Sequence, residues 1–389
     1  MKKLFALSLS LLMMVSCSSA QKEIQVGALS FDEYLPLLEG KRVSILSNQT
    51  GMVSSTTHLL DTLLDMGVNV VSIMSPEHGF RGVADAGEHV SSSIDPDTGI
   101  PIRSLYESGV NRPSDESMAE FDVMVFDLQD VGVRFYTYNA TMARMMDACA
   151  QFGKKMIVLD RPNPLGYYVD GPILDMKYKS GVGWLPVPVV HGMTLGELAL
   201  MINGEGWLKD GIQCDLTVVP CKNYTRDMEY VLPIKPSPNL PDMRSIYLYP
   251  STCYFEATPV SLGRGTDKPF QIYGHPDMTG YDFSFTPRSV PGAKNPPQLD
   301  KLCYGVDLSS LPIEENKARG INMEYVIDAY NNLKLDDKKM FRSFFELLIG
   351  QGYVREMIVE GKSAAEIEAM WADDVVKFKE QRAPYLIYE

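Results

Sequence analysis

Short runs of almost entirely apolar residues alternate with helix-like segments through the first half of the chain. This alternation restricts the fold more than any other feature. The apolar runs are Arg42–Ser47, Val68–Met74, Phe121–Asp127, Lys155–Asp160 and Cys214–Cys221. A strand that is apolar along its whole length is buried on both faces, as in a parallel sheet covered by helices. We therefore predict an α/β domain with a mostly parallel sheet and helices on both faces.

The segments between these runs have helical patterns. His58–Gly67 spaces Leu and Met at helical intervals and ends at a Gly, a common helix stop. Ala140–Phe152 places Ala, Met and Cys on one face. Thr194 and Glu197 have the spacing of a capping box, which predicts that another helix begins there.

Polar residues gather where the first four predicted strands end. The strands lead in turn into SNQTG (47–51), SPEHGFRG (75–82), DLQD (127–130) and DRPNP (160–164). The carboxyl ends of parallel strands meet at one edge of a sheet, and ligands of open α/β sheets bind beyond that edge. We therefore expect a functional site formed by these loops.

The composition changes near residue 233, where a Pro-rich stretch begins and leads into irregular sequence that continues to about residue 298. Helical patterns in Met340–Gly350 and Ser363–Arg382 close the chain. We place a domain boundary near 235–245, which divides the chain into an N-terminal domain, 25–238, and a C-terminal domain, 239–389.

The N-terminus has the pattern of a secretory signal, assigned to residues 1–20. Two Lys precede the apolar run Leu4–Val15, which is shorter than the roughly 20 residues that a membrane span needs. Cys17 follows in a sequence that resembles a bacterial lipobox, and simple cleavage after Ala20 is the alternative. We expect a lipoprotein of the bacterial cell envelope, periplasmic or at the surface, held to the membrane by a lipid on Cys17.

Charge and cysteine content narrow the possible partners. The formal net charge of the 389-residue chain is −14, which argues against binding to nucleic acid. The later cysteines have no C-x-x-C spacing and are expected to be mainly buried thiols, with a Cys214–Cys221 disulfide left open. The oligomeric state is left open as well.

Several common α/β activities lack their sequence signatures here. There is no G-x-G-x-x-G or Walker A motif and no G-x-S-x-G nucleophile elbow. The histidines do not form H-E-x-x-H or a close pair, and adjacent Glu and His residues in a loop cannot easily direct both side chains at one ion. The sequence therefore predicts neither a nucleotide nor a metal cofactor.

Carboxylates fit the predicted strand ends better. Glu77, Asp127, Asp130 and Asp160 all end or follow strands, and a pair of carboxyl groups in different environments performs acid–base chemistry at glycosidic bonds. The alternative for each is a helix cap or a loop ion pair. We favour that alternative for Asp160 and catalysis for Glu77.

Arginines and tyrosines accompany these acids. Loops bounded by Gly or Pro carry Arg81, Arg134, Arg161 and Arg264, a residue type that binds carboxylates through paired hydrogen bonds. Ion pairs with the neighbouring acids explain these arginines equally well. Tyr136 and Tyr138 suit either a sugar-binding surface or an ordinary core.

Together these motifs resemble one known family. SNQTG, SPEHGFRG, DTGIPIRSLY, DLQDVGVRFYTY, LDRPNPLG, VVHGMTLGELA, PSPNLP and GRGT…PF occur in the order seen in exo-β-N-acetylmuramidases of the NamZ type, glycoside hydrolase family 171. The resemblance runs from about Gly27 to the terminal YLIYE. Pro259 stands where the family usually has Asn, and the Arg common before His191 is missing, so substrate loops differ.

The resemblance implies a Rossmann-like N-terminal domain, a smaller α+β C-terminal domain and a site between them. It implies release of N-acetylmuramic acid (MurNAc) from the non-reducing end of peptidoglycan fragments such as MurNAc-β-1,4-GlcNAc, in cell-wall turnover, without a cofactor. A sugar-binding envelope lipoprotein without catalysis is the alternative from another class, and a peptidoglycan amidase or peptidase is a second.

We assign roles on these grounds. Glu77 is the predicted acid/base and His78 orients it or a sugar hydroxyl. The second catalytic group is Asp127, Asp130, Glu256 or the substrate's own acetamido group, and Tyr136 or Tyr138 assists at the anomeric carbon. Retention and inversion therefore both stay open. The predicted substrate-binding residues, which include the possible lactyl-carboxylate readers Arg81, Arg134 and Arg264, are Asn48, Arg81, Arg134, Tyr138, Arg161, Asn163, His191, Asn239 and Arg264.

Overall fold

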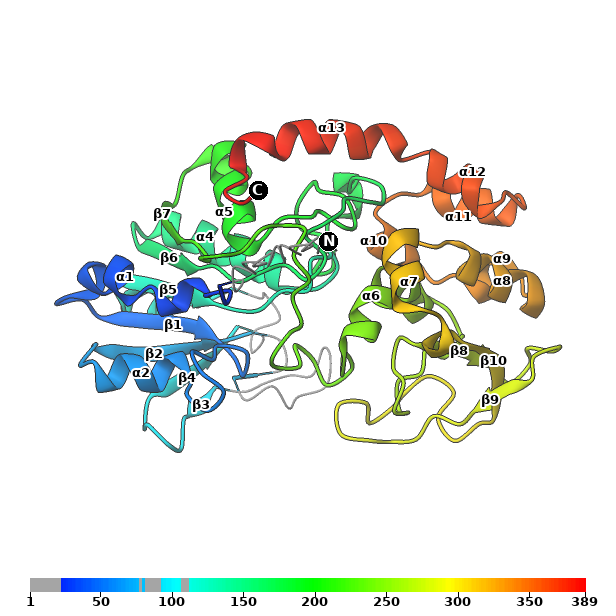
Figure 1. Cartoon of the computed structure of the whole chain (residues 1–389), viewed down its shortest axis with the longest axis horizontal. Helices are drawn as coiled ribbons and strands as arrows, with labels where there is room; N and C mark the ends of the chain where they lie inside the picture. The colour runs from blue at the N-terminus through cyan, green and yellow to red at the C-terminus, as the bar shows by residue number, and fades with distance from the viewer. Residues whose placement is uncertain (1–21, 77–78, 81–91, 106–111) are drawn as a thin grey trace, which may run out of the picture.

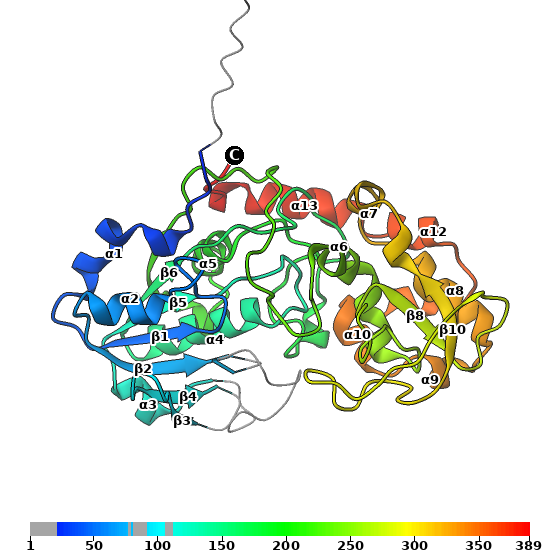
Figure 2. The same cartoon turned by 60° about the horizontal axis from the view of Figure 1, so that its bottom comes forward.

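The computed structural model describes residues 22–76, 79–80, 92–105 and 112–389 (Figure 1). Two sheets organise them, one in each half of the chain, as Figures 1 and 2 show. The predicted residues Glu77, His78 and Arg81 lie outside the described residues, as do the signal sequence and Cys17.

The larger sheet has seven strands in the order β3-β4-β2-β1-β5-β6-β7. Their bounds are β1 Val43–Ser47, β2 Val70–Ser75, β3 Ser93–Ile94, β4 Pro101–Ser104, β5 Val123–Asp127, β6 Lys155–Leu159 and β7 Asp215–Val219. All neighbours pair in parallel except β3 with β4. Numbered along the chain without β3, the six parallel strands have the order 3-2-1-4-5-6 of doubly wound folds. The strand order reverses between β1 and β5, which are neighbours in the sheet.

Helices cover both faces of this sheet, as predicted. Ile45 and Ile73 point into a core that includes residues of α1 (Phe31–Leu38) and α2 (Leu59–Asp65). Leu46 and its neighbours on the other face pack with residues of α4 (Tyr138–Gln151) and α5 (Leu195–Gly204). Successive residues of a strand point to opposite faces, so the uninterrupted apolar runs supply both cores.

The second half of the chain is a smaller α+β region. Its antiparallel sheet has the order β8-β10-β9, with β8 Ile272–His275, β9 Phe283–Phe285 and β10 Cys303–Asp307. The helices of both halves not yet named are α3 Asp115–Ala119, α6 Met243–Thr252, α7 Ile313–Arg319, α8 Glu324–Leu333, α9 Asp337–Met340, α10 Phe344–Ile349, α11 Tyr353–Val359, α12 Ala364–Ala369 and α13 Ala372–Arg382. No described helix is long and apolar enough to cross a bilayer.

The structure confirms the predicted fold class and corrects details. The capping box of Thr194 and Glu197 is present at α5. The helical pattern in Ser363–Arg382 forms two helices, α12 and α13, since the backbone turns at Met370 and Trp371 between them. Strands β3 and β4 were not predicted because they are short and lack an apolar run. All five described cysteines are buried and free, so the Cys214–Cys221 disulfide is not formed.

The C-terminal tail returns to the N-terminal sheet. Tyr388 donates a hydrogen bond from its hydroxyl to Asp160 Oδ2, 2.6 Å away. The backbone N–H groups of Ile387 and Tyr388 both donate to Glu197 Oε1, and Arg226 forms an ion pair with the same buried carboxylate. The end of the chain therefore fastens the helical C-terminal layer to α5, as Figure 1 shows.

Arg134 joins the two halves from the inside. Its side chain is fully buried. Nη2 donates to the carbonyls of Leu348 and Ile349 at the end of α10, and Nη1 donates to those of Pro172 and Val187. The last carbonyls of a helix have no partner within the helix, and a cation there is favourable. This arginine therefore caps α10 and is not exposed for the predicted substrate contact.

Arg134→Met should lower the thermal and urea unfolding midpoints strongly. Each buried carbonyl left without a donor costs about 1–3 kcal/mol. Arg288→Met is the matched control because Arg288 forms an exposed ion pair with Asp300. Equal midpoints for the two variants would contradict the role assigned to Arg134.

Candidate active site

The described strand-end residues meet at the edge of the sheet where the chain reverses direction. Asn48 directly follows β1, Asp127 is the last residue of β5, and Arg161 lies just beyond β6. Since β1, β5 and β6 are neighbours in the sheet, residues far apart in sequence come together there. Ligands bind at this point in doubly wound folds.

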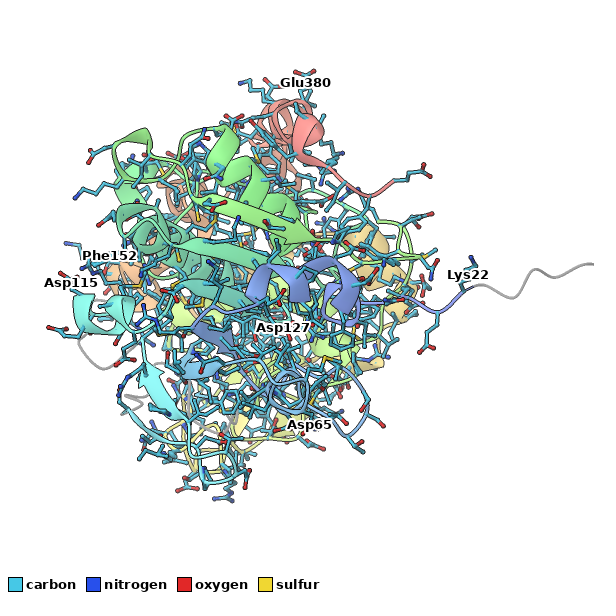
Figure 3. All side chains as sticks on the ribbon, turned by 90° about the vertical axis from the view of Figure 1, so that its left-hand side faces the viewer. Lys22, Asp65, Asp115, Asp127, Phe152 and Glu380 are labelled. Atoms are coloured by element: carbon cyan, nitrogen blue, oxygen red, sulfur yellow. The ribbon has the colours of Figure 1, made fainter. Side chains whose placement is uncertain are left out.

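Asp127 and Arg161 form a buried ion pair. The Arg161 Nε and Nη2 groups donate to Asp127 Oδ1 and Oδ2 at 2.6 and 2.9 Å, and Nη2 also donates to the carbonyl of Met52. Figure 3 labels Asp127 near the centre of the view, at the end of β5. The exposed fraction of the side chain is 0% for Asp127 and 4% for Arg161. The pair therefore has a structural role and connects the loops from the interior.

A Ser, a His and an Asp also converge here around Gly51, but their geometry is not that of a nucleophilic triad. Ser47 Oγ is 3.4 Å from His58 Nε2. In a triad the other ring nitrogen would donate to the carboxylate, whereas His58 Nδ1 accepts from the backbone N–H of Leu60 and so caps α2. Burial, the largest influence, lowers the pKa of His58.

Asp130 and His191 face each other in the interior, with His191 Nε2 4.0 Å from Asp130 Oδ2. Asp130 Oδ2 accepts from the N–H of Gly132, while Asp130 Oδ1 and His191 Nε2 have no hydrogen-bond partner among the described residues. Burial raises the pKa of Asp130 to about 7. Burial, then the charges of Arg382 and Arg134, lower the pKa of His191 to about 3, so the imidazole is neutral and the contact is not an ion pair.

Asp160 has a structural role, as expected for a helix cap. Its carboxylate accepts from the Thr194 hydroxyl and from the N–H of Gly196 at the start of α5. Burial raises the pKa of Asp160 to about 6 despite these hydrogen bonds. Asn163 is likewise buried and engaged, donating to the carbonyl of Met193 and accepting from the N–H of Leu165.

An aromatic wall extends from the end of β1 into the C-terminal half. Asn48 Nδ2 donates to the Tyr138 hydroxyl at 2.6 Å, and the Tyr138 ring lies 4.8 Å from that of Tyr136. The Tyr136 hydroxyl donates to the carbonyl of Pro236 in the segment that joins the halves. Tyr249 continues the wall, with its ring 6.5 Å from that of Tyr136.

A small pocket of about 80 Å³ opens against this wall between the two halves. It is lined by Phe135, Tyr136, Thr137, Tyr138, Val182, Ser237, Asn239, Leu240, Tyr249, Glu256, Arg264 and Phe270. Glu256 Oε1 accepts from Arg264 Nε at 3.0 Å, and the guanidinium lies 5.1 Å from the centre of the Phe270 ring. The pocket therefore joins aromatic surface to one carboxylate and one cation, which suits a sugar.

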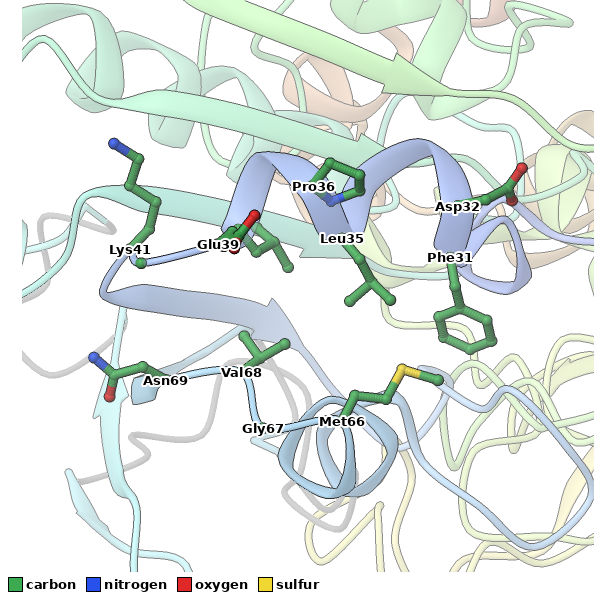
Figure 4. A pocket seen from close by; sticks show the side chains of 12 residues that line it. Phe31, Asp32, Leu35, Pro36, Glu39, Lys41, Met66, Gly67, Val68 and Asn69 are labelled. Atoms are coloured by element: carbon green, nitrogen blue, oxygen red, sulfur yellow. The ribbon is translucent and has the colours of Figure 1, made fainter.

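A larger cavity, of about 580 Å³, lies at the opposite end of the sheet. Figure 4 shows Phe31 and Leu35 of α1 facing Met66 and Val68, with Lys41 and Asn69 at the rim. These residues precede or flank the amino ends of β1 and β2, far from the strand-end acids. Its size does not make it the site, because ligands of doubly wound folds bind beyond the carboxyl ends of the strands, not at their amino ends.

The structure brings part of the predicted set together. Tyr136, Tyr138, Asn239, Glu256 and Arg264 line the interdomain pocket, and Asn48 bonds to its wall. Asp127, Asp130, Arg161, Asn163 and His191 lie buried among protein atoms, like Arg134. Direct contact of these buried residues with substrate would require exposure that this conformation lacks, and the roles of the pocket residues stay predictions.

Other lining residues had no sequence signal. No motif marks Tyr249, in α6, or Phe270, and only the fold brings them to the pocket that Tyr136 also lines. No group of three or more His, Cys, Asp or Glu that could hold a metal ion occurs among the described residues.

Comparison with known proteins decides the family. The N-terminal model of "Exo-beta-N-acetylmuramidase NamZ" matches residues 43–244 and the C-terminal model matches residues 247–388. The chain belongs to the NamZ family. Peptidoglycan beta-N-acetylmuramidase NamZ of Bacillus subtilis strain 168 is 37% identical over 373 residues, which cover 92% of this chain and 89% of that protein.

Solved structures agree with this NamZ-family assignment. A DUF1343 family protein of Bacteroides fragilis NCTC 9343, solved at 1.30 Å, is 60% identical with a TM-score of 0.88 over 95% of this chain and 99% of that chain. A second DUF1343 protein of the same organism is 29% identical with a TM-score of 0.78 over 94% of this chain and 99% of its own.

Gly51→Ala should reduce both stability and turnover. A Cβ there would meet Ser47 Oγ, would lie 2.7 Å from His58 Nε2 and would crowd Asp127. Overpacking of a tight site costs roughly 1–3 kcal/mol. Gly181→Ala is the control, because nothing lies within 4 Å of its Cβ position and its φ is not positive. Unchanged unfolding and kinetics for Gly51→Ala would disprove the constraint.

Asp130→Asn should stabilise the protein relative to wild type more at pH 8 than at pH 5. The pKa of Asp130 is raised in the fold to about 7, above the unfolded value of about 3.9, so wild-type stability falls as pH rises between these values. The asparagine removes that loss. Urea unfolding of both proteins across this range measures it, and a pH-independent difference would contradict the burial of the charged carboxylate.

Proposed function

We propose that this chain is a glycoside hydrolase that releases MurNAc from the non-reducing end of peptidoglycan fragments such as MurNAc-β-1,4-GlcNAc. The observation that carries the proposal is the match to NamZ family models over both halves of the chain. The interdomain pocket is lined by residues of both halves, and every lining residue named above falls within one of the two matched ranges. A relative named as a peptidoglycan β-N-acetylmuramidase supports the reaction class.

The pocket favours one of the candidate second groups. Glu256 is the only one of the candidate acids Asp127, Asp130 and Glu256 that lines the pocket, while Asp127 is held by Arg161 and Asp130 is buried. Glu256 forms an ion pair with Arg264, and a carboxylate at this position is suited to stabilise positive charge that develops at the anomeric carbon. Glu77 remains the proposed proton donor because it follows β2, whose carboxyl end lies at the same edge.

We further propose that the protein acts in the bacterial cell envelope, attached by a lipid on Cys17. The basic and apolar N-terminal pattern followed by Cys supports this. Globomycin, which blocks the signal peptidase for lipoproteins, should cause the precursor to accumulate. A Cys17→Ala variant processed at the same site with equal membrane association would contradict lipidation.

Product analysis tests the activity. Purified protein incubated with MurNAc-GlcNAc or para-nitrophenyl β-MurNAc should release free MurNAc, and early NMR of its anomeric proton distinguishes retention from inversion. Saccharide binding without turnover would favour a sugar-binding lipoprotein. Cleavage of stem peptides with the glycosidic bond intact would favour an amidase or peptidase.

Glu77→Gln should lower kcat by roughly 10²–10⁴-fold, because it removes the proposed proton donor. Glu380→Gln on α13 is the matched control; Glu380 lies on the outer surface in Figure 3. Near-normal turnover by Glu77→Gln would exclude the role, and circular dichroism of both variants checks that folding is intact.

A further inference from the structure

The small interdomain pocket, called the aromatic pocket below, has a neighbouring cavity in the C-terminal half, called the second cavity. Its volume is about 400 Å³, and Glu256 and Arg264 line both cavities. Asn239, from the aromatic pocket, donates a hydrogen bond at 2.7 Å to the carbonyl of Gly292, which lines the second cavity. The two spaces are therefore neighbours separated by the Glu256–Arg264 ion pair.

The second cavity is cationic, although the whole chain carries a net charge of −14. Among the residues that the structure describes, the cavity is lined by three cations, Arg264, Lys294 and Arg342, and by one carboxylate, that of Glu256. Local clusters of like charge in an acidic protein attract ligands of the opposite sign. The charge therefore predicts an anionic ligand.

Arg342 has the geometry to contribute. Its Nη2 donates to the carbonyl of Thr258, and its backbone N–H donates to that of Ala257, which fix the residue at the wall. A guanidinium has five N–H donors, so most of them stay available to a ligand. The opposite wall is the loop 292–297, which Gly292 holds close to Pro238: a Cβ there would lie 2.5 Å from that ring.

Size and chemistry select the ligand. The aromatic pocket, at about 80 Å³, holds only part of a sugar, whereas about 400 Å³ falls within the range of roughly 300–1,000 Å³ typical of ligand sites. Muramic acid differs from glucosamine by a 3-O-lactyl ether that ends in a carboxylate or, in peptidoglycan, continues as a stem peptide. Arginine pairs recognise carboxylates through charge-assisted hydrogen bonds.

We propose that the cationic cavity binds a carboxylate on the 3-O-lactyl arm of the muramic acid residue, with Arg264, Lys294 and Arg342 as its cations. The carboxylate is that of the free lactyl group or, where this group is amidated, one of the stem peptide. The inference rests on the proposed function, since it assumes that a muramic acid residue occupies the neighbouring aromatic pocket.

Steady-state kinetics of Lys294→Gln and Arg342→Gln test the proposal. The substrates are para-nitrophenyl β-MurNAc, its lactyl carboxamide, and the glycoside carrying L-Ala-D-Glu on the lactyl group. On the substrate whose carboxylate occupies the cavity, each variant should raise KM roughly 10-fold or more with kcat little changed, because a charge-assisted hydrogen bond is lost. Arg342→Lys should recover part of the loss.

The substrate series identifies the source of the carboxylate. If the free lactyl group is bound, the wild type should bind the carboxamide about 10-fold more weakly, and the variants should lose that preference. If the stem peptide is bound, the L-Ala-D-Glu substrate should have a lower KM than the carboxamide, again only in the wild type. Variant KM values equal to wild type on all three substrates would overturn the proposal.

Controls separate this result from failure of the proposed function. Arg288→Gln removes an exposed cation outside the cavity and should leave the KM values unchanged. If the wild type turns over none of the substrates, calorimetric titration with MurNAc and with GlcNAc still tests the cavity. Preference for MurNAc that Lys294→Gln and Arg342→Gln abolish supports the subsite without catalysis, and equal binding of both sugars overturns it.

Discussion

The buried ion pair between Asp127 and Arg161 holds together the loops on which the site is built. It joins the end of β5 to the loop after β6, and Arg161 also reaches the carbonyl of Met52 in the loop after β1. Removing one partner of such a pair leaves a charge buried without compensation, which typically costs about 3–5 kcal/mol. The pair therefore fixes three neighbouring strand ends relative to one another.

Hydrogen bonds of the aromatic wall connect these strand ends to the segment that joins the two halves of the chain. Asn48, held beside the ion pair, bonds to Tyr138, and Tyr136 bonds to the linker carbonyl of Pro236. Arg134 ties the same region to α10 by donating to the carbonyls of Leu348 and Ile349. Because these ties are buried, Glu256 and Arg264 are placed opposite the strand ends without relying on surface contacts.

Much of the fold could be predicted because local sequence carries the reason for it. Strands buried on both faces must be apolar throughout, and the capping box at Thr194 marks the start of α5 within one residue. The break between α12 and α13 escaped prediction because helical residues continue through it. Strands β3 and β4 escaped because they have only two and four residues and lack an apolar run.

The site was less predictable, since charge and position in a loop do not reveal burial. Arg134 and Arg264 have similar sequence surroundings, yet the first donates to backbone carbonyls in the interior and the second lines two pockets. The sequence by itself determined the α/β class, the edge of the sheet that carries the polar loops and the NamZ family resemblance, because these depend on local patterns and ordered motifs. Only the tertiary structure decided which of the described polar groups face a cavity, because burial and partners such as Lys294 and Arg342 arise from contacts between distant segments.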